Sequence, residues 1–527
     1  MRPLAASVVG ALIAGLTAAV PATAQVGPAT PLHATGPQPS IAPFFGGPVT
    51  PHRVRGVRPA WSSPFMAPNP KNSVHNDPWQ TDTYTSLGGP LGRDPEVLST
   101  RIGRTCITLT FDRRGRLIGS CINLPDGPGL YLLDPRTLAT LAFHQLPYTP
   151  PPAGTNPALN TTGGAYFYLD QRDRAVLAAA DRRIHVYRVD DSGAAPRFRQ
   201  VAVYDPRPCL QPGERMPSAL PDARGRLWFV GRTQGTIGVI DRRTGRCRSI
   251  VLHEEIENSF AVATDGVYIV SDKAQYKLRA GRSLEPRTVW RFRYRNSGIA
   301  KPGQINAGSG TTPTLLRGLH ERRGQTAPAY VAITDNADPM NVVVLRTADR
   351  AARRLVCEVP VFAKGASATE NSLIGTGRSL VVENNYGYDL TKFNDVISGD
   401  VAIGGNRALV STPGMTRIDL RADGRGCRVV WTNTDVRPAS VVSKGDAVNG
   451  LVYSFENVAD PMIPDADPWT WTAVDLRTGA VRWRRLAGWG GEYNNHYAGI
   501  ALGKAPGGRP TLYLGAVGGV MALRDGS

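Results

Sequence analysis

The chain of 527 residues lacks the short motifs that identify several large enzyme classes. It contains no G-x-S-x-G, H-E-x-x-H, G-x-x-x-x-G-K-[ST] or G-x-G-x-x-G pattern. These absences exclude α/β-hydrolases with a serine elbow, zincins, P-loop NTPases and dinucleotide-binding folds. No C-x-x-C pair occurs, which argues against a thioredoxin-like or structural zinc site.

Long apolar runs are also absent, except at the N-terminus. There Met1-Arg2-Pro3 precedes the uncharged run Leu4–Val20, and Ala22-Thr23-Ala24 follows. A basic start, an apolar stretch and an A-x-A site are typical of a signal peptide, here cleaved after Ala24. No later segment approaches the roughly 20 apolar residues of a membrane span. We predict a signal peptide over residues 1–24 and an exported protein, periplasmic or secreted, without a transmembrane segment.

Basic residues are numerous but form no long run. The 61 Lys and Arg exceed the 43 Asp and Glu, which gives a net charge of +18. This excess would suit an acidic partner. However, the arginines are scattered singly or in doublets such as Arg113-Arg114, and no basic amphipathic helix is present. We therefore predict that the protein has no nucleic-acid partner. We also predict that it is a monomer.

Six cysteines form an even set, as expected for disulfides in an oxidising compartment. They are Cys106, Cys121, Cys209, Cys247, Cys357 and Cys427. Six cysteines allow 15 pairings, and spacing alone does not choose among them. Cys106 and Cys121 flank a hairpin-like stretch, so we predict that they pair with each other.

The composition and the hydrophobic pattern of the chain change near residue 95. Residues 25–94 begin with a stretch rich in Pro, Gly, Ala and Ser, and we predict an extended or partly disordered arm. From there to residue 527, short β-branched runs are broken by Gly, Asp and Asn, with almost no helical period. This pattern predicts one large all-β domain over residues 95–527.

Hairpins recur along this domain. Asp112–Arg116 and Asp222–Arg226 are D-x-x-G-R turns between alternating strands, and Asp265-Gly266 and Thr376-Gly377 are tighter turns. Repeating units begin near residues 106, 162, 215, 259, 310, 370, 441 and 495. Their spacing fits the four-stranded blade of a β-propeller and gives eight blades, with seven left open. The last unit has three strands, and residues 95–102 are expected to supply the fourth and close the ring.

One segment carries a family resemblance. Residues 473–483 read A-V-D-L-R-T-G-A-V-R-W, and a weaker copy at Asp241–Gly245 lacks the tryptophan. The A-x-D-x-x-T-G-x-x-x-W pattern resembles the docking motif of PQQ-like, quinoprotein-type propeller repeats. The resemblance implies that Asp475, Thr478 and Gly479 shape a turn and that Trp483 packs between blades. It supports the architecture more than the cofactor. The D-x-x-G-R hairpins also look like those of gluconolactonase-type propellers.

Polar residues recur where the fold would direct them toward one mouth of the central channel. In a propeller, the loops that enter the innermost strands share a face with the loops that join the second and third strands. The predicted metal ligands are Glu257, Asn258, Glu370, Asn371, Glu383, Asn384, Glu456 and Asn457. Carboxylate and amide oxygens suit Ca²⁺. The alternative is that these residues cap strand ends by bonding to nearby backbone groups.

Other residues near this mouth suggest chemistry. His496 is the only histidine of the group and Asp335 lies in a neighbouring loop, so both are candidate general acids or bases. Trp469 and Trp471 end a Pro-stiffened loop and are candidate stacking surfaces for a flat cofactor such as PQQ. The segment His75–Trp79 is expected to fold across a face as a lid or plug.

Three functions are consistent with these features. The first is a quinoprotein-type oxidoreductase that binds a small or extended ligand at the channel mouth, with Ca²⁺. The second is a Ca²⁺-dependent lactonase or esterase. The third is a non-catalytic envelope scaffold for protein partners. A propeller hosts all three, so the function has to be decided by the site.

Overall fold

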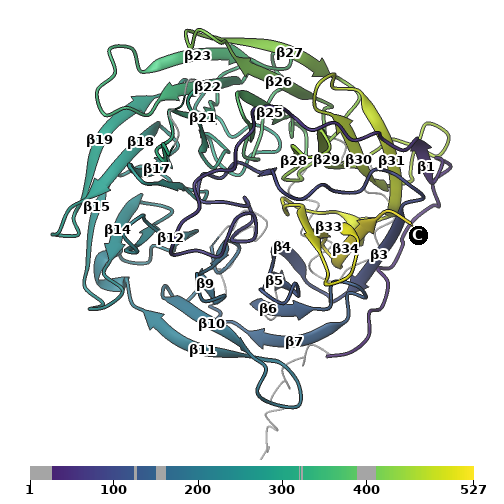
Figure 1. The fold of residues 1–527 in the computed structure, drawn as a ribbon, viewed down its shortest axis with the longest axis horizontal. Coiled ribbons are helices and arrows are strands. Elements are labelled where there is room, and N and C mark those ends of the chain that lie inside the picture. Colours follow the sequence, from purple (N-terminus) through teal and green to yellow (C-terminus); the bar gives the residue numbers. More distant parts are fainter. Residues whose placement is uncertain are drawn as a thin grey trace, which may run out of the picture.

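The computed structural model describes residues 26–123, 127–149, 162–319, 321, 324–388 and 411–526. Within these residues, eight β-sheets surround a central axis (Figure 1), seven with four strands and one with six. The prediction of an all-β, eight-bladed propeller is confirmed, and the seven-bladed alternative is wrong. The predicted signal peptide lies outside the described residues.

The strands of each blade follow one another from the axis to the rim, and each predicted unit start falls at or shortly before an innermost strand. Blades 1 to 4 comprise β4 (Thr105–Phe111), β5 (Leu117–Asn123), β6 (Gly127–Leu133) and β7 (Thr140–Gln145); β8 (Phe167–Leu169), β9 (Ala175–Ala178), β10 (Ile184–Asp190) and β11 (Arg197–Tyr204); β12 (Ala219–Pro221), β13 (Leu227–Val230), β14 (Thr236–Ile240) and β15 (Cys247–Val251); and β16 (Ala261–Ala263), β17 (Gly266–Val270), β18 (Ala274–Ala280) and β19 (Pro286–Arg293).

Blades 5 to 8 repeat the arrangement. They comprise β20 (Thr314–Leu316), β21 (Tyr330–Thr334), β22 (Asn341–Arg346) and β23 (Leu355–Pro360); β24 (Ile374–Thr376), β25 (Ser379–Glu383), β26 (Met415–Leu420) and β27 (Cys427–Asn433); β28 (Lys444–Asp446), β29 (Leu451–Asn457), β30 (Pro468–Asp475) and β31 (Val481–Trp489); and β32 (Ala501–Lys504), β33 (Pro510–Gly515) and β34 (Gly519–Arg524). In the described part of the chain, two short 3₁₀ helices lie between blades, η2 (Arg207–Cys209) and η3 (Gly491–Tyr493).

Blade 8 is completed by a strand from the other end of the sequence. β3 (Glu96–Arg101) pairs antiparallel with β34, with Glu96 opposite Arg524 and Arg101 opposite Gly519. This is the ring closure predicted for residues 95–102. It joins the first and last parts of the propeller and leaves no open sheet edge between them.

The D-x-x-G-R hairpins owe their shape to one aspartate each. Asp112 accepts hydrogen bonds from the Arg116 backbone N–H (2.8 Å) and from Arg116 Nε (2.7 Å), while Gly115 adopts a φ of +78°. Asp222 and Arg226 repeat the arrangement at 3.0 and 2.7 Å. Because the carboxylate binds both backbone and guanidinium, the turn sequence fixes its own conformation.

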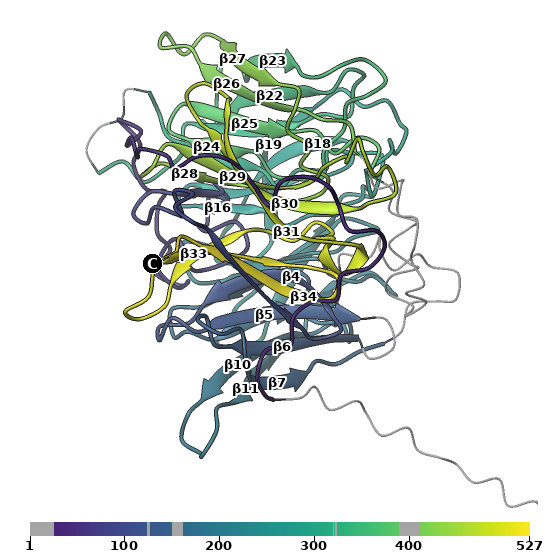
Figure 2. The ribbon, with the colours of Figure 1, turned by 90° about the vertical axis from the view of Figure 1, so that its right-hand side faces the viewer.

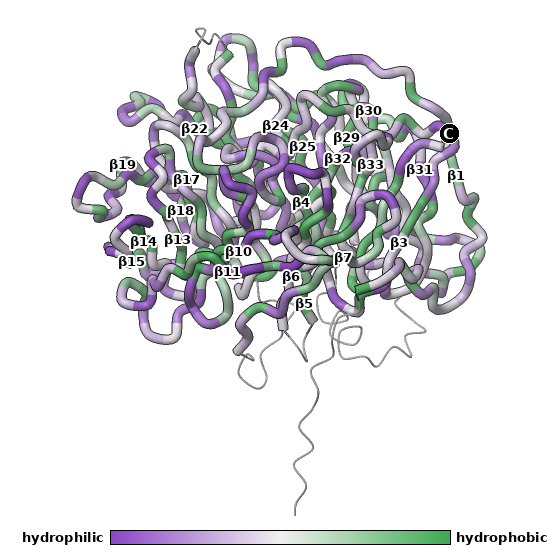
Figure 3. The backbone as a smooth tube through the Cα atoms, turned by 60° about the horizontal axis from the view of Figure 1, so that its bottom comes forward, coloured by the Kyte–Doolittle hydropathy of each residue, from purple (hydrophilic) through white to green (hydrophobic). Residues whose placement is uncertain are grey.

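Apolar side chains from adjacent blades form the core, and hydrophobic and hydrophilic stretches alternate along the chain of the ring (Figure 3). Three disulfides reinforce the blades. Cys106–Cys121 joins β4 and β5, as predicted, Cys209–Cys247 ties η2 to β15, and Cys357–Cys427 links the rim strands of blades 5 and 6. No helix in the described part of the chain is long and apolar enough to cross a membrane.

The residues before blade 1 wrap around blades 7 and 8 and then cross the ring (purple in Figures 1 and 2). β1 (Phe44–Gly46) adds a strand at the rim of blade 7 by pairing with β31, and β2 (Thr83–Tyr84) pairs in parallel with β28 near the axis. This arm therefore contributes strands at both edges of one blade.

The stretch Asn72–Tyr84, which we call the axial segment, is buried against the innermost strands. Its carbonyl groups accept hydrogen bonds from residues of five blades. The pairs are Leu169 N–H to Asn72 (2.7 Å), Val262 to Pro78 (2.8 Å), Leu315 to Trp79 (2.9 Å), Gly375 to Thr81 (2.8 Å) and Gly445 to Asp82 (2.8 Å). The axial segment thus satisfies backbone donors that face the channel and acts as a plug.

Candidate functional site

Five side chains from alternate blades converge at one mouth of the channel. Tyr166, Glu257, Asn258, Glu370 and Tyr497 form what we call the mouth cluster. They lie just before the innermost strands of blades 2, 4, 6 and 8. The Tyr166 hydroxyl donates to Asn258 Oδ1 (2.9 Å), and Glu257 and Glu370 both raise the pKa of Tyr166 and of Tyr497 after burial itself. The predicted convergence of entry loops is therefore present for blades 4 and 6.

The two carboxyl groups of the mouth cluster are buried with little compensating charge. Glu257 is 3% exposed, and burial raises its pKa to about 8, against the opposing effect of Arg232, whose Nη2 lies 3.6 Å from Glu257 Oε1. Burial, and then the charge of Glu257, raise the pKa of Glu370 well above its usual value. Arg232 also binds Glu255 at 3.2 Å, so one guanidinium serves two carboxylates.

Glu370 has one oxygen committed and one not. Its Oε1 accepts a hydrogen bond from the Ile305 backbone N–H (3.1 Å). Its Oε2 is buried and has no hydrogen-bond partner among the described residues. A buried acceptor without a partner is costly, so this atom points to a proton or a bound group.

A second acidic position lies close to the first. Asn371 Nδ2 donates to Glu383 Oε2 (2.8 Å) and to the Val441 carbonyl (2.5 Å). Burial raises the pKa of Glu383 to about 8, although Asn371 acts in the opposite direction. Because Asn371 adjoins Glu370 in sequence, the two acidic positions belong to one region of the channel.

The axial segment brings a buried ionic triad into the channel. His75 Nδ1 lies 2.9 Å from Asp82 Oδ2, and Lys444 Nζ donates to Asp82 Oδ1 and to the Val74 carbonyl. Burial acts to raise the pKa of Asp82, but His75 and Lys444 together outweigh it and lower that pKa. Burial lowers the pKa of Lys444 despite the opposing charge of Asp82.

The geometry of this triad orients the imidazole. Asp82 fixes Nδ1, while His75 Nε2 is buried and has no hydrogen-bond partner in the described part of the chain. The His75 ring stacks near Tyr166 of the mouth cluster, with ring centroids 6.3 Å apart. A carboxylate on one ring nitrogen and a free second nitrogen is the arrangement of a general base.

His496 lies in a different environment. Its Nδ1 is 3.2 Å from the Tyr388 hydroxyl, and the same hydroxyl donates to Asn494 Oδ1 (3.0 Å). His496 and Tyr497 both adopt positive φ, of 38° and 58°. This backbone conformation is uncommon for residues with a Cβ and marks a loop held by its surroundings.

Four other predicted site residues bind within their own loops or blades. Asn341 N–H and Nδ2 donate to Asp335 (2.7 and 2.8 Å), the Asn384 side chain bonds to Ala366 and Ala368, Glu456 pairs with Arg484 (3.1 Å), and Asn457 Nδ2 donates to Asp467 (2.6 Å). Asp335 and Asn384 bond to nearby backbone groups, as the strand-capping alternative expects, whereas Glu456 and Asn457 bind side chains of their own blade. The structure does not bring these four side chains into the mouth cluster.

The two predicted stacking tryptophans lie in the core of blade 7. Trp469 and Trp471 are 0% exposed and pack against Phe455, with ring centroids 5.7 and 5.2 Å away. Neither indole presents a face to the channel mouth. The aromatic rings that are partly exposed there are Tyr166 and Tyr497, which the sequence pattern did not single out.

Among the described residues, no group of three or more His, Cys, Asp or Glu side chains is arranged to hold a metal ion. A cation at the mouth would therefore need the two carboxylates supplemented by amide or hydroxyl oxygens. Asn258 and Tyr166 supply oxygens beside Glu257, in keeping with the preference of Ca²⁺ for mixed oxygen ligands.

Comparison with protein-family models and with curated proteins gives no match. Solved structures with a similar fold include the quinohemoprotein alcohol dehydrogenase ADHIIG of Pseudomonas putida HK5, at 11% identity over 86% of this chain and 77% of that one, with a TM-score of 0.49. A europium-containing methanol dehydrogenase matches at 11% identity over 85% and 91%, with a TM-score of 0.50. A putative 6-phosphogluconolactonase of Bacteroides fragilis matches at 9% identity over 71% and 97%, with a TM-score of 0.39.

At these identities the likeness concerns the fold alone. It agrees with the resemblance to quinoprotein-type propellers that residues 473–483 suggest. In the structure, Asp475 Oδ1 accepts hydrogen bonds from Arg477 N–H (2.9 Å) and Thr478 N–H (3.0 Å), and Gly479 adopts a φ of +77°. The chain is thus an eight-bladed β-propeller, and its likeness to these proteins is one of fold.

Proposed function

We propose that this protein is an exported propeller that binds a small polar ligand at the mouth cluster, together with a hard cation such as Ca²⁺. The observation that carries the proposal is the buried pair Glu257 and Glu370. Arg232, which lies 3.6 Å from Glu257, also pairs with Glu255, and Glu370 Oε2 has no hydrogen-bond partner among the described residues. Two carboxylates removed from water need a proton or a cation, since the cost of burying unpaired charge is large. A divalent cation would neutralise both and use the second oxygen of Glu370. Three disulfides and the N-terminal sequence support export.

Calcium titration tests this proposal directly. We expect Ca²⁺ to raise the melting temperature, because a ligand that binds only the native state stabilises it, by about 2.7 kcal/mol at 100 times Kd. Without the ion, the free energy of unfolding should decrease as the pH rises from about 5 to 8. Over this range the folded state keeps protons on Glu257 and Glu370 that the unfolded state releases. The shift caused by Ca²⁺ should therefore be larger at pH 8 than at pH 5.5.

Variants separate the site from other buried acids. Glu370→Gln should abolish the response to Ca²⁺ and should stabilise the calcium-free protein at pH 8. Asp467→Asn is the matched control, because Asp467 is also a buried carboxyl group with its pKa raised to about 6, but it binds Asn457 and Trp469 instead. Eu³⁺ luminescence offers a second readout of the same site. Equal responses of wild type and Glu370→Gln to Ca²⁺ would rule the site out.

A quinone-dependent oxidoreductase is the second candidate, favoured by the complete docking motif at residues 473–483. The mouth cluster would hold such a cofactor beside the proposed cation at Glu257 and Glu370. The partly exposed rings of Tyr166 and Tyr497 would provide the stacking surface that the sequence analysis assigned to Trp469 and Trp471. A bound PQQ would supply the electron acceptor. The chain itself would orient the substrate and accept a hydroxyl proton at His75 Nε2, with Asp82 holding the imidazole.

This candidate predicts dye-linked oxidation of an alcohol or a sugar that requires both PQQ and Ca²⁺. His75→Asn should lower kcat by about 10²–10⁴-fold, as expected for loss of a general base. His496→Asn should retain most activity. If PQQ neither shifts the melting temperature nor supports turnover, the oxidoreductase is wrong. Lactone hydrolysis that EDTA abolishes would then assign the site to a hydrolase.

A further inference from the structure

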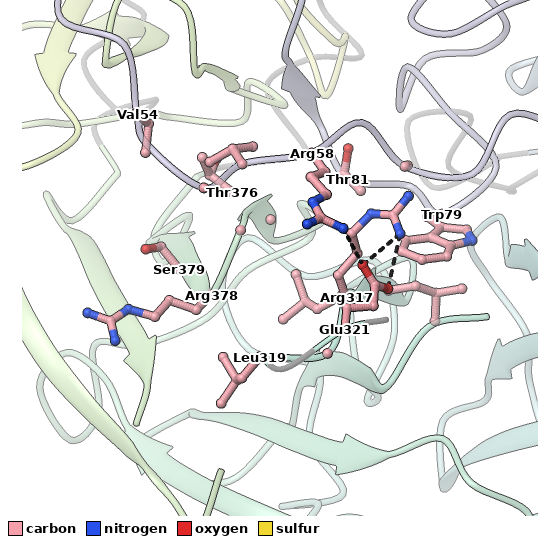
Figure 4. Close-up of a pocket in the computed structure, with 18 of the residues that line it drawn as sticks. Val54, Arg58, Trp79, Thr81, Arg317, Leu319, Glu321, Thr376, Arg378 and Ser379 are labelled. Carbon is pink, nitrogen blue, oxygen red and sulfur yellow. Dashed lines mark hydrogen bonds and ion pairs between the residues drawn. The ribbon is translucent and has the colours of Figure 1, made fainter. Parts of the chain in front are cut away.

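A cavity opens on the face opposite the mouth cluster. It has a volume of about 510 Å³ and lies where the first and second strands of blades 5 and 6 turn. Residues 54–58 of the arm form one wall, and the turn Gly375–Ser379 forms another (Figure 4). Because entry loops and first turns lie at opposite ends of a blade, this cavity is separate from the proposed calcium site.

Five arginines line this cavity, namely Arg55, Arg58, Arg317, Arg378 and Arg417. Two carboxylates lie within ion-pair distance of them in the described part of the chain. Glu321 binds Arg317 (2.9 Å) and lies 3.9 Å from Arg58. Asp419 binds Arg417 (2.8 Å) and lies 3.7 Å from Arg378. The cavity therefore carries a clear excess of positive charge.

The arginines fall into two groups. Arg317 and Arg417 are structural: Arg317 donates to the Pro59 carbonyl (2.7 Å) and stacks on Trp79, and Arg417 grips Asp419 through two bonds and donates to Leu476. Figure 4 shows Arg317 and Arg58 turned toward Glu321. The second group comprises Arg55, Arg58 and Arg378. The side chains of Arg58 and Arg378 are 58% and 45% exposed, and their ion pairs, with Glu321 and Asp419, are as long as 3.9 and 3.7 Å. Arg55 is exposed and has no hydrogen bond or ion pair with a described residue.

We infer that this cavity binds a small anion that carries phosphate groups. The guanidinium group presents two parallel N–H donors that match phosphate oxygens, and it keeps its charge at any physiological pH. Arg55, Arg58 and Arg378 line this cavity, and the protein leaves their donors largely unused. A recessed cavity of this size favours a small molecule over an extended polymer, and the chain has no basic run of the kind that tracks a nucleic-acid backbone.

Pyrophosphate titration by calorimetry at low ionic strength tests the inference. We expect binding that is tighter than that of sulfate or citrate and that weakens as salt increases. The double variant Arg55→Gln/Arg378→Gln should reduce affinity about ten-fold or more, because charge-assisted hydrogen bonds are lost. Both side chains are at the surface, so the melting temperature should stay unchanged and confirm folding.

Arg114→Gln is the matched control. Arg114 lines another arginine-rich pocket on the same face, where Asp191 pairs with it at 3.3 Å and binds Arg116 at 2.6 Å. Its removal lowers the net charge by one, where the double variant lowers it by two, and should leave pyrophosphate affinity within about two-fold, as expected for an exposed, paired charge. No binding at millimolar pyrophosphate, or an equal loss in both variants, would overturn the inference. Calcium binding at the mouth cluster is independent of either result.

Discussion

Replacing Lys444 by methionine is expected to lower the free energy of unfolding by about 3–5 kcal/mol. Removing one partner of a buried ion pair leaves the charge of the other buried without its counter-ion. Lys444 and Asp82 are both 0% exposed, and the ammonium also donates to the Val74 carbonyl. Without Lys444, the Asp82 carboxylate keeps only His75 as a charged partner. Urea denaturation of the two proteins at pH 7 measures the difference.

The double variant Asp82→Asn/Lys444→Met serves as the control for this prediction. It removes both charges, so it should recover a large part of the stability lost in the single variant. Lys504→Met, at an exposed position, should change stability by less than about 0.5 kcal/mol. A loss below about 1 kcal/mol for Lys444→Met would mean that Asp82 is not held by this ammonium.

The same ion pair bears on function, since it fixes the axial segment. Asp82 lies on the axial segment and Lys444 on β28, which hydrogen-bonds to that segment. Asn76, Gln80 and Asp82 all adopt positive φ, which the surrounding contacts have to hold in place. Weakening the pair should therefore loosen the segment that orients His75.

The repetitive part of the fold was predictable because its determinants are local. Each D-x-x-G-R turn closes through contacts within five residues, and the β-branched runs on either side define the strands. Cys106 and Cys121 lie opposite each other in one hairpin, so their pairing followed from the same pattern. The last repeating unit has three strands in the sequence, and this shortfall pointed to residues 95–102 as the source of the fourth.

The axial segment was not predictable in the same way. Residues 72–84 show no alternating pattern and contain Pro78, so only a general lid or plug could be anticipated. Their burial depends on backbone hydrogen bonds to five blades that are distant in the sequence. His75 and Lys444 are 369 positions apart, and no spacing rule connects them.

The candidate site was predicted in part. The Glu-Asn entries at residues 257–258 and 370–371 do lie at the channel, because their place before an innermost strand fixes their direction. Trp469 and Trp471 were assigned to a loop, but they are alternate residues of β30 and so share one buried face. That period of two was the available signal. Glu456 pairs with Arg484 of β31, which no local pattern indicates.

Replacing Trp483 by alanine is expected to cost about 3–5 kcal/mol, as for other large buried aromatic residues. Trp483 is 0% exposed and packs near Tyr453, with ring centroids 6.2 Å apart. The arm covers it from outside: Gly46 pairs with Trp483, and a Cβ on Gly92 would lie 2.6 Å from the indole. The side chain therefore joins the rim of blade 7 to the arm as well as to its own sheet.

Thermal and urea unfolding of Trp483→Ala should show this loss, and Trp483→Phe should recover part of it by filling the cavity. Blade 3 has a different anchor for its rim strand, so it does not need the tryptophan of the complete motif. In the partial copy that begins at Asp241, Ser249 takes the place of the tryptophan, and the disulfide Cys209–Cys247 anchors the same rim strand instead. Reducing the disulfides should thus destabilise blade 3 without affecting the tryptophan anchor of blade 7. If Trp483→Ala leaves stability within about 1 kcal/mol of wild type, β1 alone anchors that rim, and the motif tryptophan is dispensable.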